Sequence, residues 1–334
     1  MRTELDHWLS LQQMLRGYRV GQVLITSTRL GIFPLLSTGA ATAATLAEQT
    51  RTEPLALARL LNAGVALGLL TKAGDLYANA PLAETCLAQD RRYYMGHLVQ
   101  REHAFYQRWG WLDEAVRTGQ RPEANARDEG QRNWVLDFEL ALYDLARVAA
   151  PAVAEALDLP TDRPLRLLDV GGGHGGYSMA LARHYPNVTA TVYELPAAAE
   201  AAHTILVGEG MADRVHVQIG NFQQDELGAG YDLILLFGVL VSETPAGKLS
   251  LLQKAQRALV PGGQVALREW CFAEDRTTPP DVTLSSLHML LSTQAGDIST
   301  EDELKSWLAE AGFAAPQRLN LPAWAGSVLM AHKR

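Results

Sequence analysis

The strongest chemical signal in this sequence is a glycine-rich segment that follows an apolar run and an acid. It spans residues 167–176 and reads Leu-Leu-Asp-Val-Gly-Gly-Gly-His-Gly-Gly. Glycine lets the backbone turn tightly and approach a ligand closely, and a helix N-terminus offers free N–H groups to a carboxylate or phosphate. The segment therefore predicts a ligand-binding loop in which Gly171 and Gly173 contact the ligand. A tight strand-to-helix turn with no ligand is the simpler alternative.

The glycine spacing does not choose the ligand by itself. Gly171, Gly173 and Gly176 also fit the dinucleotide-binding fingerprint. Asp169 stands before the first glycine, where a negative charge suits a ligand with an ammonium and a sulfonium better than a pyrophosphate. We therefore predict S-adenosylmethionine (SAM) as the cofactor, and an NAD-dependent dehydrogenase is a weaker alternative.

The ends of the following strands carry residues that fit a nucleoside. Glu194 would accept hydrogen bonds from ribose hydroxyls, which would serve NAD equally well. Asn221 and Phe222 would offer an amide to an adenine edge and a ring that stacks on it. Phe237, at the end of the next strand, completes the predicted cofactor contacts.

The second half of the chain has the pattern of a parallel sheet with helices on both faces. Short apolar runs alternate with helical segments, and we predict strands at 165–170, 189–193, 215–219, 231–237, 264–269, 318–321 and 327–332. Before the last two strands, Thr300 and Glu303 form a capping box that opens a helix closed by Gly312. The fold class is α/β, and ligands in such sheets bind beyond the carboxyl ends of the strands.

The first 155 residues are almost entirely helical in pattern. Residues 42–80 read as a short helix, a longer helix over 54–70 and a hairpin, which is the outline of a winged helix. The longer helix is apolar nearly all round and Arg59 is its one charged residue from Leu55 onward. A DNA-reading helix presents polar side chains, so we expect this helix to pack against protein, in a dimer interface.

Residues 97–155 predict two or three further helices, broken by a turn at 119–123. We expect the domains to span residues 1–100, 101–160 and 161–334. The middle part and the last third supply the predicted walls of an apolar substrate pocket. These residues are His103, Trp109, Trp134, Phe138, Leu142, Met289 and, near the end of the chain, Trp324.

Composition excludes several classes of protein. The chain has 334 residues and a formal net charge of −8, whereas a nucleic-acid binder needs a basic face. Its two cysteines, Cys86 and Cys271, are too far apart and too few for a disulfide framework or a cysteine zinc site, and no metal is expected. The N-terminus shows no signal pattern and no apolar run approaches the length of a membrane span. We expect a cytoplasmic protein without a membrane or nucleic-acid partner.

The motifs in combination resemble the small-molecule O-methyltransferase family that includes plant phenylpropanoid, vertebrate hydroxyindole and bacterial polyketide-tailoring enzymes. Residues 168–173 match its glycine motif, 194–196 resemble its Asp-Leu-Pro, and 220–222 resemble its Gly-Asp-Phe. Residues 261–263 and 311–313 also match. The resemblance covers nearly the whole chain. It implies a SAM-binding class I methyltransferase sheet with an antiparallel last strand, a winged-helix dimerisation domain and a homodimer that acts on a small molecule.

The sequence departs from this family where many members carry a catalytic histidine after the fourth strand. The aligned residue is Val241, and the basic residue often found near Phe237 is missing. O-methylation of a phenol would then need another base. Glu269 at the end of the fifth strand and His288 in a later helix are the predicted catalytic residues, ahead of Glu243 and His174.

Several functions remain open on the sequence alone. The leading one is methyl transfer from SAM to an oxygen or carbon atom of an aromatic or polyketide-like small molecule. Val241 also allows an enzyme of the same scaffold that uses SAM for a decarboxylation, hydroxylation or rearrangement. A SAM-sensing regulator that binds DNA through the winged helix is a third hypothesis, which the acidic charge opposes.

Overall fold

The computed structural model describes residues 2–125 and 132–334. The chain divides into two compact units, an N-terminal unit that ends at Ala104 and a C-terminal unit that begins at Phe105. The finer division at residues 100 and 160 stays a prediction. No helix among the described residues combines the length and the apolar character that crossing a membrane requires.

The N-terminal unit is a set of helices around a small antiparallel sheet with strand order β1-β3-β2. Its elements are α1 (Arg2–Arg16), α2 (Tyr18–Arg29), α3 (Ile32–Ser37), β1 (Ala41–Thr42), α4 (Ala43–Thr50), α5 (Pro54–Ala66), β2 (Leu70–Ala73), β3 (Leu76–Asn79), α6 (Pro81–Cys86) and the first part of α7 (Gly96–Trp109). The succession of α4, α5 and the β2–β3 hairpin is the predicted winged helix.

Helices α4 and α5 begin where the sequence provides caps. The hydroxyl of Thr42 accepts a hydrogen bond from the backbone N–H of Thr45, and the Glu53 carboxylate accepts from Leu55 and Ala56. Helix α5 ends at Ala66, not at residue 70 as predicted. Gly68 has a φ of +72° and stops the helix, and Leu70 then lies buried in β2. An apolar run alone did not separate the end of the helix from the start of the strand.

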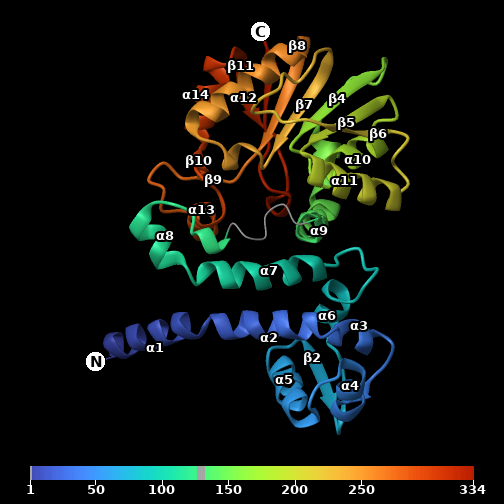
Figure 1. Ribbon diagram of the computed structural model, residues 1–334, viewed down its shortest axis with the longest axis vertical. Coiled ribbons are helices and arrows are strands. Elements are labelled where there is room, and N and C mark those ends of the chain that lie inside the picture. The colour runs from blue at the N-terminus through green and yellow to red at the C-terminus, as the bar shows by residue number, and fades with distance from the viewer. Residues whose placement is uncertain (1, 126–131) are drawn as a thin grey trace. The chain divides into compact units, whose positions relative to one another are not determined.

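The described residues of the C-terminal unit form a seven-stranded sheet with the order β11-β12-β8-β7-β4-β5-β6 (Figure 1). Its strands are β4 (Leu165–Val170), β5 (Val188–Glu194), β6 (Val215–Ile219), β7 (Tyr231–Phe237), β8 (Leu259–Arg268), β11 (Phe313–Arg318) and β12 (Leu329–Lys333). The pairs from β6 across to β8 are parallel, and β12 runs antiparallel to both β8 and β11. The predicted α/β class with an antiparallel last strand is confirmed.

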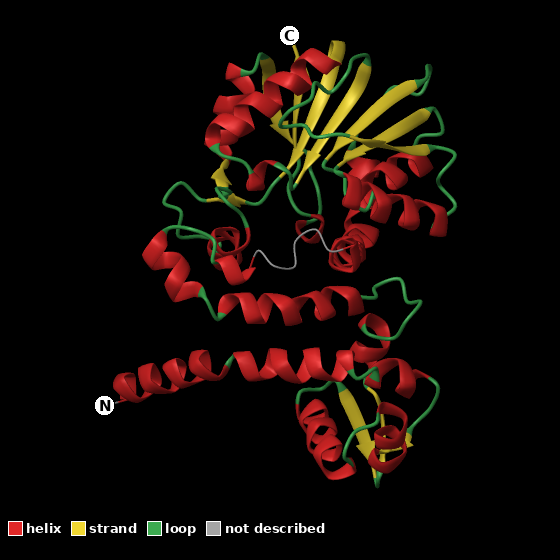
Figure 2. Cartoon of the chain, viewed as in Figure 1, coloured by secondary structure: helices red, strands yellow, loops and turns green. Residues whose placement is uncertain are grey.

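Helices cover both faces of this sheet (Figure 2). The helical elements are α8 (Leu112–Thr118), η1 (Glu123–Asn125), α9 (Arg132–Ala156), α10 (Gly176–His184), α11 (Pro196–Gly208), η2 (Leu240–Ser242), α12 (Pro245–Ala258), α13 (Pro280–Ser292), α14 (Glu301–Glu310) and η3 (Ala323–Ala325). Helix α9 packs on α10 and α11 at one face, and α12 packs on α14 at the other. Successive residues of β4 alternate between the two cores, since Leu167 belongs to one and Leu168 to the other.

The chain after α12 differs from the prediction in the position of the edge strand. The capping box is present, with Thr300 Oγ1 accepting from Glu303 N–H and Glu303 Oε2 accepting from Thr300 N–H. Strand β11 begins at Phe313, directly after Gly312, and ends at Arg318, so the prediction of a strand at 318–321 was wrong except for its first residue. Phe313 is fully buried, so its packing fixes the start of the strand.

Candidate functional site

The polar ends of the parallel strands meet at one edge of the sheet. The chain leaves β4 toward β5 and β6 on one side, and β7 lies on the other side of β4. This reversal is the place where open α/β sheets bind ligands. Gly171 follows β4, Glu194 ends β5, Asn221 follows β6, Phe237 ends β7 and Glu269 follows β8. The structure therefore brings the strand-end residues predicted from sequence to one edge.

The loop after β4 has room for glycine and little else. Gly171 and Gly173 have φ values of +64° and +48°. A Cβ atom on Gly171 would lie 2.8 Å from Val239 Cγ2, and one on Gly173 would overlap the Glu139 carboxylate. Gly175, with a φ of +66°, is the N-cap of α10. The loop is thus a close-fitting backbone cradle, of the kind that a small ligand contacts through main-chain groups.

Asp169 and Glu194 hold this loop from two sides. Ser178 Oγ donates to Asp169 Oδ2 at 2.7 Å, and burial raises the pKa of the Asp169 carboxyl to about 7. Glu194 Oε1 accepts from Gly173 N–H at 3.1 Å, and Oε2 accepts from Leu195 N–H. Burial raises the pKa of Glu194 as well. Contact of either acid with a cofactor stays a prediction.

Asn221, Phe222 and Phe237 lie half-buried near the same edge. Asn221 Oδ1 accepts from Gln223 N–H at 2.9 Å, which fixes the turn after β6. Phe222 packs against the sheet core, and its carbonyl accepts from Lys254 Nζ at 2.7 Å. The ring of Phe237 meets Tyr177 edge to face at 4.8 Å between centroids. All three predicted cofactor residues are therefore held in place by the surrounding fold.

Glu269 supports the turn in which Val241 stands. Its Oε1 accepts from Leu240 N–H at 3.0 Å, and the side chain is 9% exposed. Burial raises the pKa of this carboxyl to about 8. Glu269 therefore positions η2 in this structure, and its predicted role as a base stays a prediction.

An aromatic cluster, made of Phe105, Trp134, Phe138 and His288, joins α7, α9 and α13. The rings of Phe105 and His288 lie 4.1 Å apart, and those of Trp134 and Phe138 lie 6.0 Å apart. Ser292 Oγ is 3.2 Å from His288 Nε2. The structure thus brings together two predicted pocket residues, Trp134 and Phe138, and the predicted catalytic residue His288, and it adds Phe105, which no sequence motif indicates.

The remaining predicted wall residues are distributed over several elements. Leu142 and Met289 are half-buried on α9 and α13. Trp109 lines a surface depression with residues of α8, and Trp324 is 62% exposed in η3. His103 belongs to the N-terminal unit, where burial and the charge of Arg29 lower its pKa. Their contact with a substrate stays a prediction.

His174 has a structural role in the glycine loop. Its Nδ1 accepts from Gly176 N–H at 2.8 Å, and burial lowers its pKa to about 4. The ring is therefore neutral near pH 7 and fixes the start of α10, which agrees with its low rank among the base candidates.

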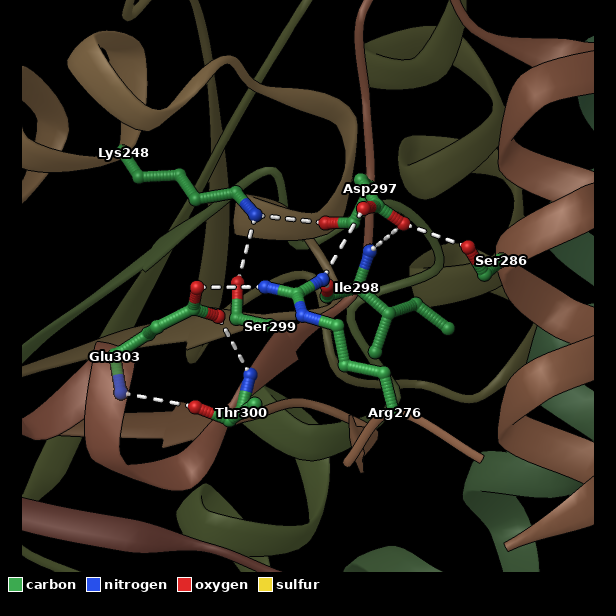
Figure 3. Close-up of polar contacts among 8 residues, drawn as sticks. All are labelled: Lys248, Arg276, Ser286, Asp297, Ile298, Ser299, Thr300 and Glu303. Carbon is green, nitrogen blue, oxygen red and sulfur yellow. Dashed lines mark hydrogen bonds and ion pairs between the residues drawn. The ribbon is translucent and has the colours of Figure 1, made fainter. Parts of the chain in front are cut away.

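A polar network anchors the helix that carries His288 (Figure 3). Asp297 Oδ1 accepts from Ser286 Oγ of α13 at 2.7 Å, and its backbone carbonyl accepts from Lys248 Nζ of α12. Arg276 pairs with Asp297 at 3.5 Å and with Glu303 of α14 at 2.6 Å. The network joins α12, α13 and α14, and the sequence showed no local signal for it.

Comparisons with known proteins match both units. An O-methyltransferase domain covers residues 115–314, and an O-methyltransferase dimerisation domain covers residues 12–89. The chain is 31% identical to 3-hydroxy-5-methyl-1-naphthoate 3-O-methyltransferase of Streptomyces sahachiroi, over 90% of this chain and 88% of that protein. It is also 31% identical to acetylserotonin O-methyltransferase of Mus musculus, over 94% and 85%. Human N-acetylserotonin methyltransferase in complex with SAM has a similar structure, with a TM-score of 0.88, 26% identity and coverage of 98% and 97%.

We predict that Gly171→Ala weakens binding of S-adenosylhomocysteine (SAH) at least about tenfold, because a Cβ at positive φ is strained and would press on Val239. Isothermal titration calorimetry measures this. Gly208→Ala is the matched control, since a Cβ there meets nothing within 4 Å. Unchanged SAH affinity in Gly171→Ala would contradict the assignment of this loop to the cofactor.

We predict that Glu269 makes stability fall as pH rises. In the unfolded chain the carboxyl loses its proton near the ordinary glutamate pKa of 4.5, whereas the folded state keeps it to about 8. The unfolded state therefore binds fewer protons between these values, and the free energy of unfolding drops by up to about 5 kcal/mol across that window. Glu269→Gln keeps the acceptor for Leu240 and should flatten this slope in urea titrations from pH 5 to 8. Parallel stability curves for the two proteins would refute the prediction.

Proposed function

This chain belongs to the O-methyltransferase family, and from that premise we propose that it methylates a flat, apolar small molecule. The chain is a SAM-dependent methyltransferase, as are the relatives that match nearly its whole length. The comparisons give no support to a non-methylating enzyme, a DNA-binding regulator or a dehydrogenase. The acceptor, the reacting atom and the roles of individual side chains are proposals.

The residues at the strand ends fit SAM. Gly171 and Gly173 have no side chain that could cover the backbone of the loop, and the acidic groups around it suit a cationic methionine end. Glu194 would hold the ribose, and Asn221 with Phe222 would hold the adenine. Bound SAM supplies an activated methyl group on sulfur. The protein supplies the alignment of the acceptor, and such positioning is worth effective molarities of about 10⁵–10⁸ M.

The aromatic cluster carries our proposal for the acceptor. Phe105, Trp134 and Phe138 provide flat apolar surfaces, and His288 lies against Phe105 as a polar group among them. A planar ring system with a hydroxyl or an activated carbon fits such a wall. Two relatives carry names of hydroxynaphthoate and acetylserotonin methyltransferases. We therefore propose an aromatic or polyketide-like acceptor, methylated on oxygen or carbon.

The base, where one is needed, is proposed to be His288 in preference to Glu269. His288 is a member of the aromatic cluster and packs against Phe105, whereas one carboxylate oxygen of Glu269 already accepts a hydrogen bond from Leu240 N–H. A positioned base contributes about 10²–10⁴-fold to rate. An acceptor with an acidic phenol or an activated carbon would need less of this help.

Labelled methyl transfer from SAM to a panel of hydroxynaphthoates, phenols and indole amides tests the proposal. We expect transfer to a planar acceptor with one SAH formed per methyl group. With that acceptor, His288→Ala should lower kcat about 10²-fold or more, and Glu269→Gln should lower it less than about tenfold. A larger loss of kcat in Glu269→Gln than in His288→Ala would instead identify Glu269 as the base. Product formed without SAH would refute methyl transfer.

We also propose that the protein works as a homodimer. A dimerisation domain covers residues 12–89. Large apolar side chains of α1 are exposed in the single chain, among them Leu11 at 66%, Met14 at 78% and Leu15 at 73%. Exposed apolar surface of this kind is typical of a protein interface, and a second copy of this chain is the partner we propose.

We predict that Leu11→Glu with Leu15→Glu converts the dimer to a monomer, because two charges would be buried at the interface without partners. Size-exclusion chromatography with light scattering measures the mass. Gln12→Glu on the same helix is the charge control and should stay dimeric. A doubly substituted chain of unchanged dimeric mass would place the interface elsewhere.

A reducing compartment such as the cytoplasm is proposed as the site of action. Cys86 and Cys271 are both free and lie in different units, as expected of a protein that does not depend on disulfides.

A further inference from the structure

Glu139 of α9 is a buried acid whose position no motif explains. Glu139 is only 6% exposed. The backbone N–H of His174 donates to its carboxyl group, while Oε2 has no hydrogen-bond partner in the described structure. A buried acceptor left without a donor costs roughly 1–3 kcal/mol. A bound ligand that supplies a donor would offset this cost.

The unpartnered oxygen faces the glycine loop. A Cβ atom on Gly173 would meet Glu139 Oε2 before any other atom. Glu194 binds the N–H of the same glycine, so two carboxyl groups flank one loop residue. Asp169 lies in the same environment, since the charge of Glu194 acts on both Asp169 and Glu139.

These acids repel one another, and burial disfavours their charges. Burial raises the pKa of Glu139 to about 8, and the negative charge of Glu194 contributes to the same rise. A cation placed among the three carboxyl groups would reverse both effects. The ligand that fits this place therefore brings positive charge together with N–H donors.

We propose that Glu139 Oε2 accepts a hydrogen bond from the α-ammonium group of the methionine moiety of SAM. The inference rests on the SAM-dependent function stated above. An ammonium has three N–H donors and a full charge, so it satisfies the free oxygen and the local excess of acid together. The sulfonium carries charge but no N–H, and the ligand carboxylate would be repelled.

Ligand binding to Glu139→Gln tests this assignment. Titration calorimetry compares the wild type with the variant for SAM, SAH and methylthioadenosine. SAM and SAH both contain the ammonium, whereas methylthioadenosine lacks the whole amino-acid end. The control variant is Glu155→Gln, which makes the same charge change at an exposed position of α9.

We expect Glu139→Gln to weaken SAM and SAH by similar factors of about tenfold to a hundredfold, because the glutamine oxygen can still accept but carries no negative charge opposite the ammonium. Methylthioadenosine affinity should stay within about twofold, which also shows that the nucleoside site is intact. Glu155→Gln should bind all three ligands as the wild type does.

Three results with Glu139→Gln would overturn the assignment. Unchanged SAH affinity would show that the acid does not contact the ammonium. A loss confined to SAM would point to the sulfonium, and an equal loss for methylthioadenosine would mean that Glu139 only shapes the loop. Equal affinity of the wild type for methylthioadenosine, SAM and SAH would also overturn it, because the amino-acid end of the ligand would then contribute nothing to binding. Absence of SAM binding in the wild type would instead overturn the cofactor assignment itself.

Discussion

The site depends on one constraint, which is the lack of space around the loop after β4. Val239 closes on Gly171 and the Glu139 carboxylate closes on Gly173, so the backbone itself forms the surface. Ser178 and Glu194 hold this loop through side-chain hydrogen bonds at 2.7 and 3.1 Å. A loop held in this way does not need to reorganise when a ligand binds along it. In the proposed SAM site, the remaining strand ends then need only supply the contacts to the nucleoside.

The aromatic cluster that we propose for the acceptor is built in a different way. Helices α7, α9 and α13 come from separate parts of the sequence, and aromatic contacts join them. Helix α13 is anchored through Ser286 to Asp297, and Arg276 ties Asp297 to α14. Several groups of this network lie near the surface, where single ion pairs contribute about 0–1 kcal/mol. Lys248 is buried, and its hydrogen bonds to the Asp297 carbonyl and to buried Ser299 therefore carry more of the anchoring.

The regular parts of the fold could be predicted because local pattern and packing agree. Strands β4, β6 and β7 have the bounds expected from their apolar runs, and the capping box starts α14 where Thr300 and Glu303 require. The prediction was wrong for the end of α5, where apolar residues continue from the helix into β2. It also missed the partners of His288, since Phe105 reaches it from a distant helix. The sequence does contain a local signal for Glu139, because this acid lies at helical spacing from the apolar residues Val135 and Leu142. An acid on an apolar helix face indicates a buried charge.

The absence of a histidine at Val241 has a smaller effect than its place in the site suggests. A general base contributes about 10²–10⁴-fold, whereas alignment of two reactants reaches effective molarities of about 10⁵–10⁸ M. The turn that would carry the base keeps its shape through the bond from Leu240 N–H to Glu269. On the proposed function, alignment of the acceptor with SAM would therefore contribute more to the rate than a base would. Acceptors that ionise easily relax the need for a base. On the proposed function, valine at position 241 is therefore compatible with methyl transfer to an acceptor that ionises easily.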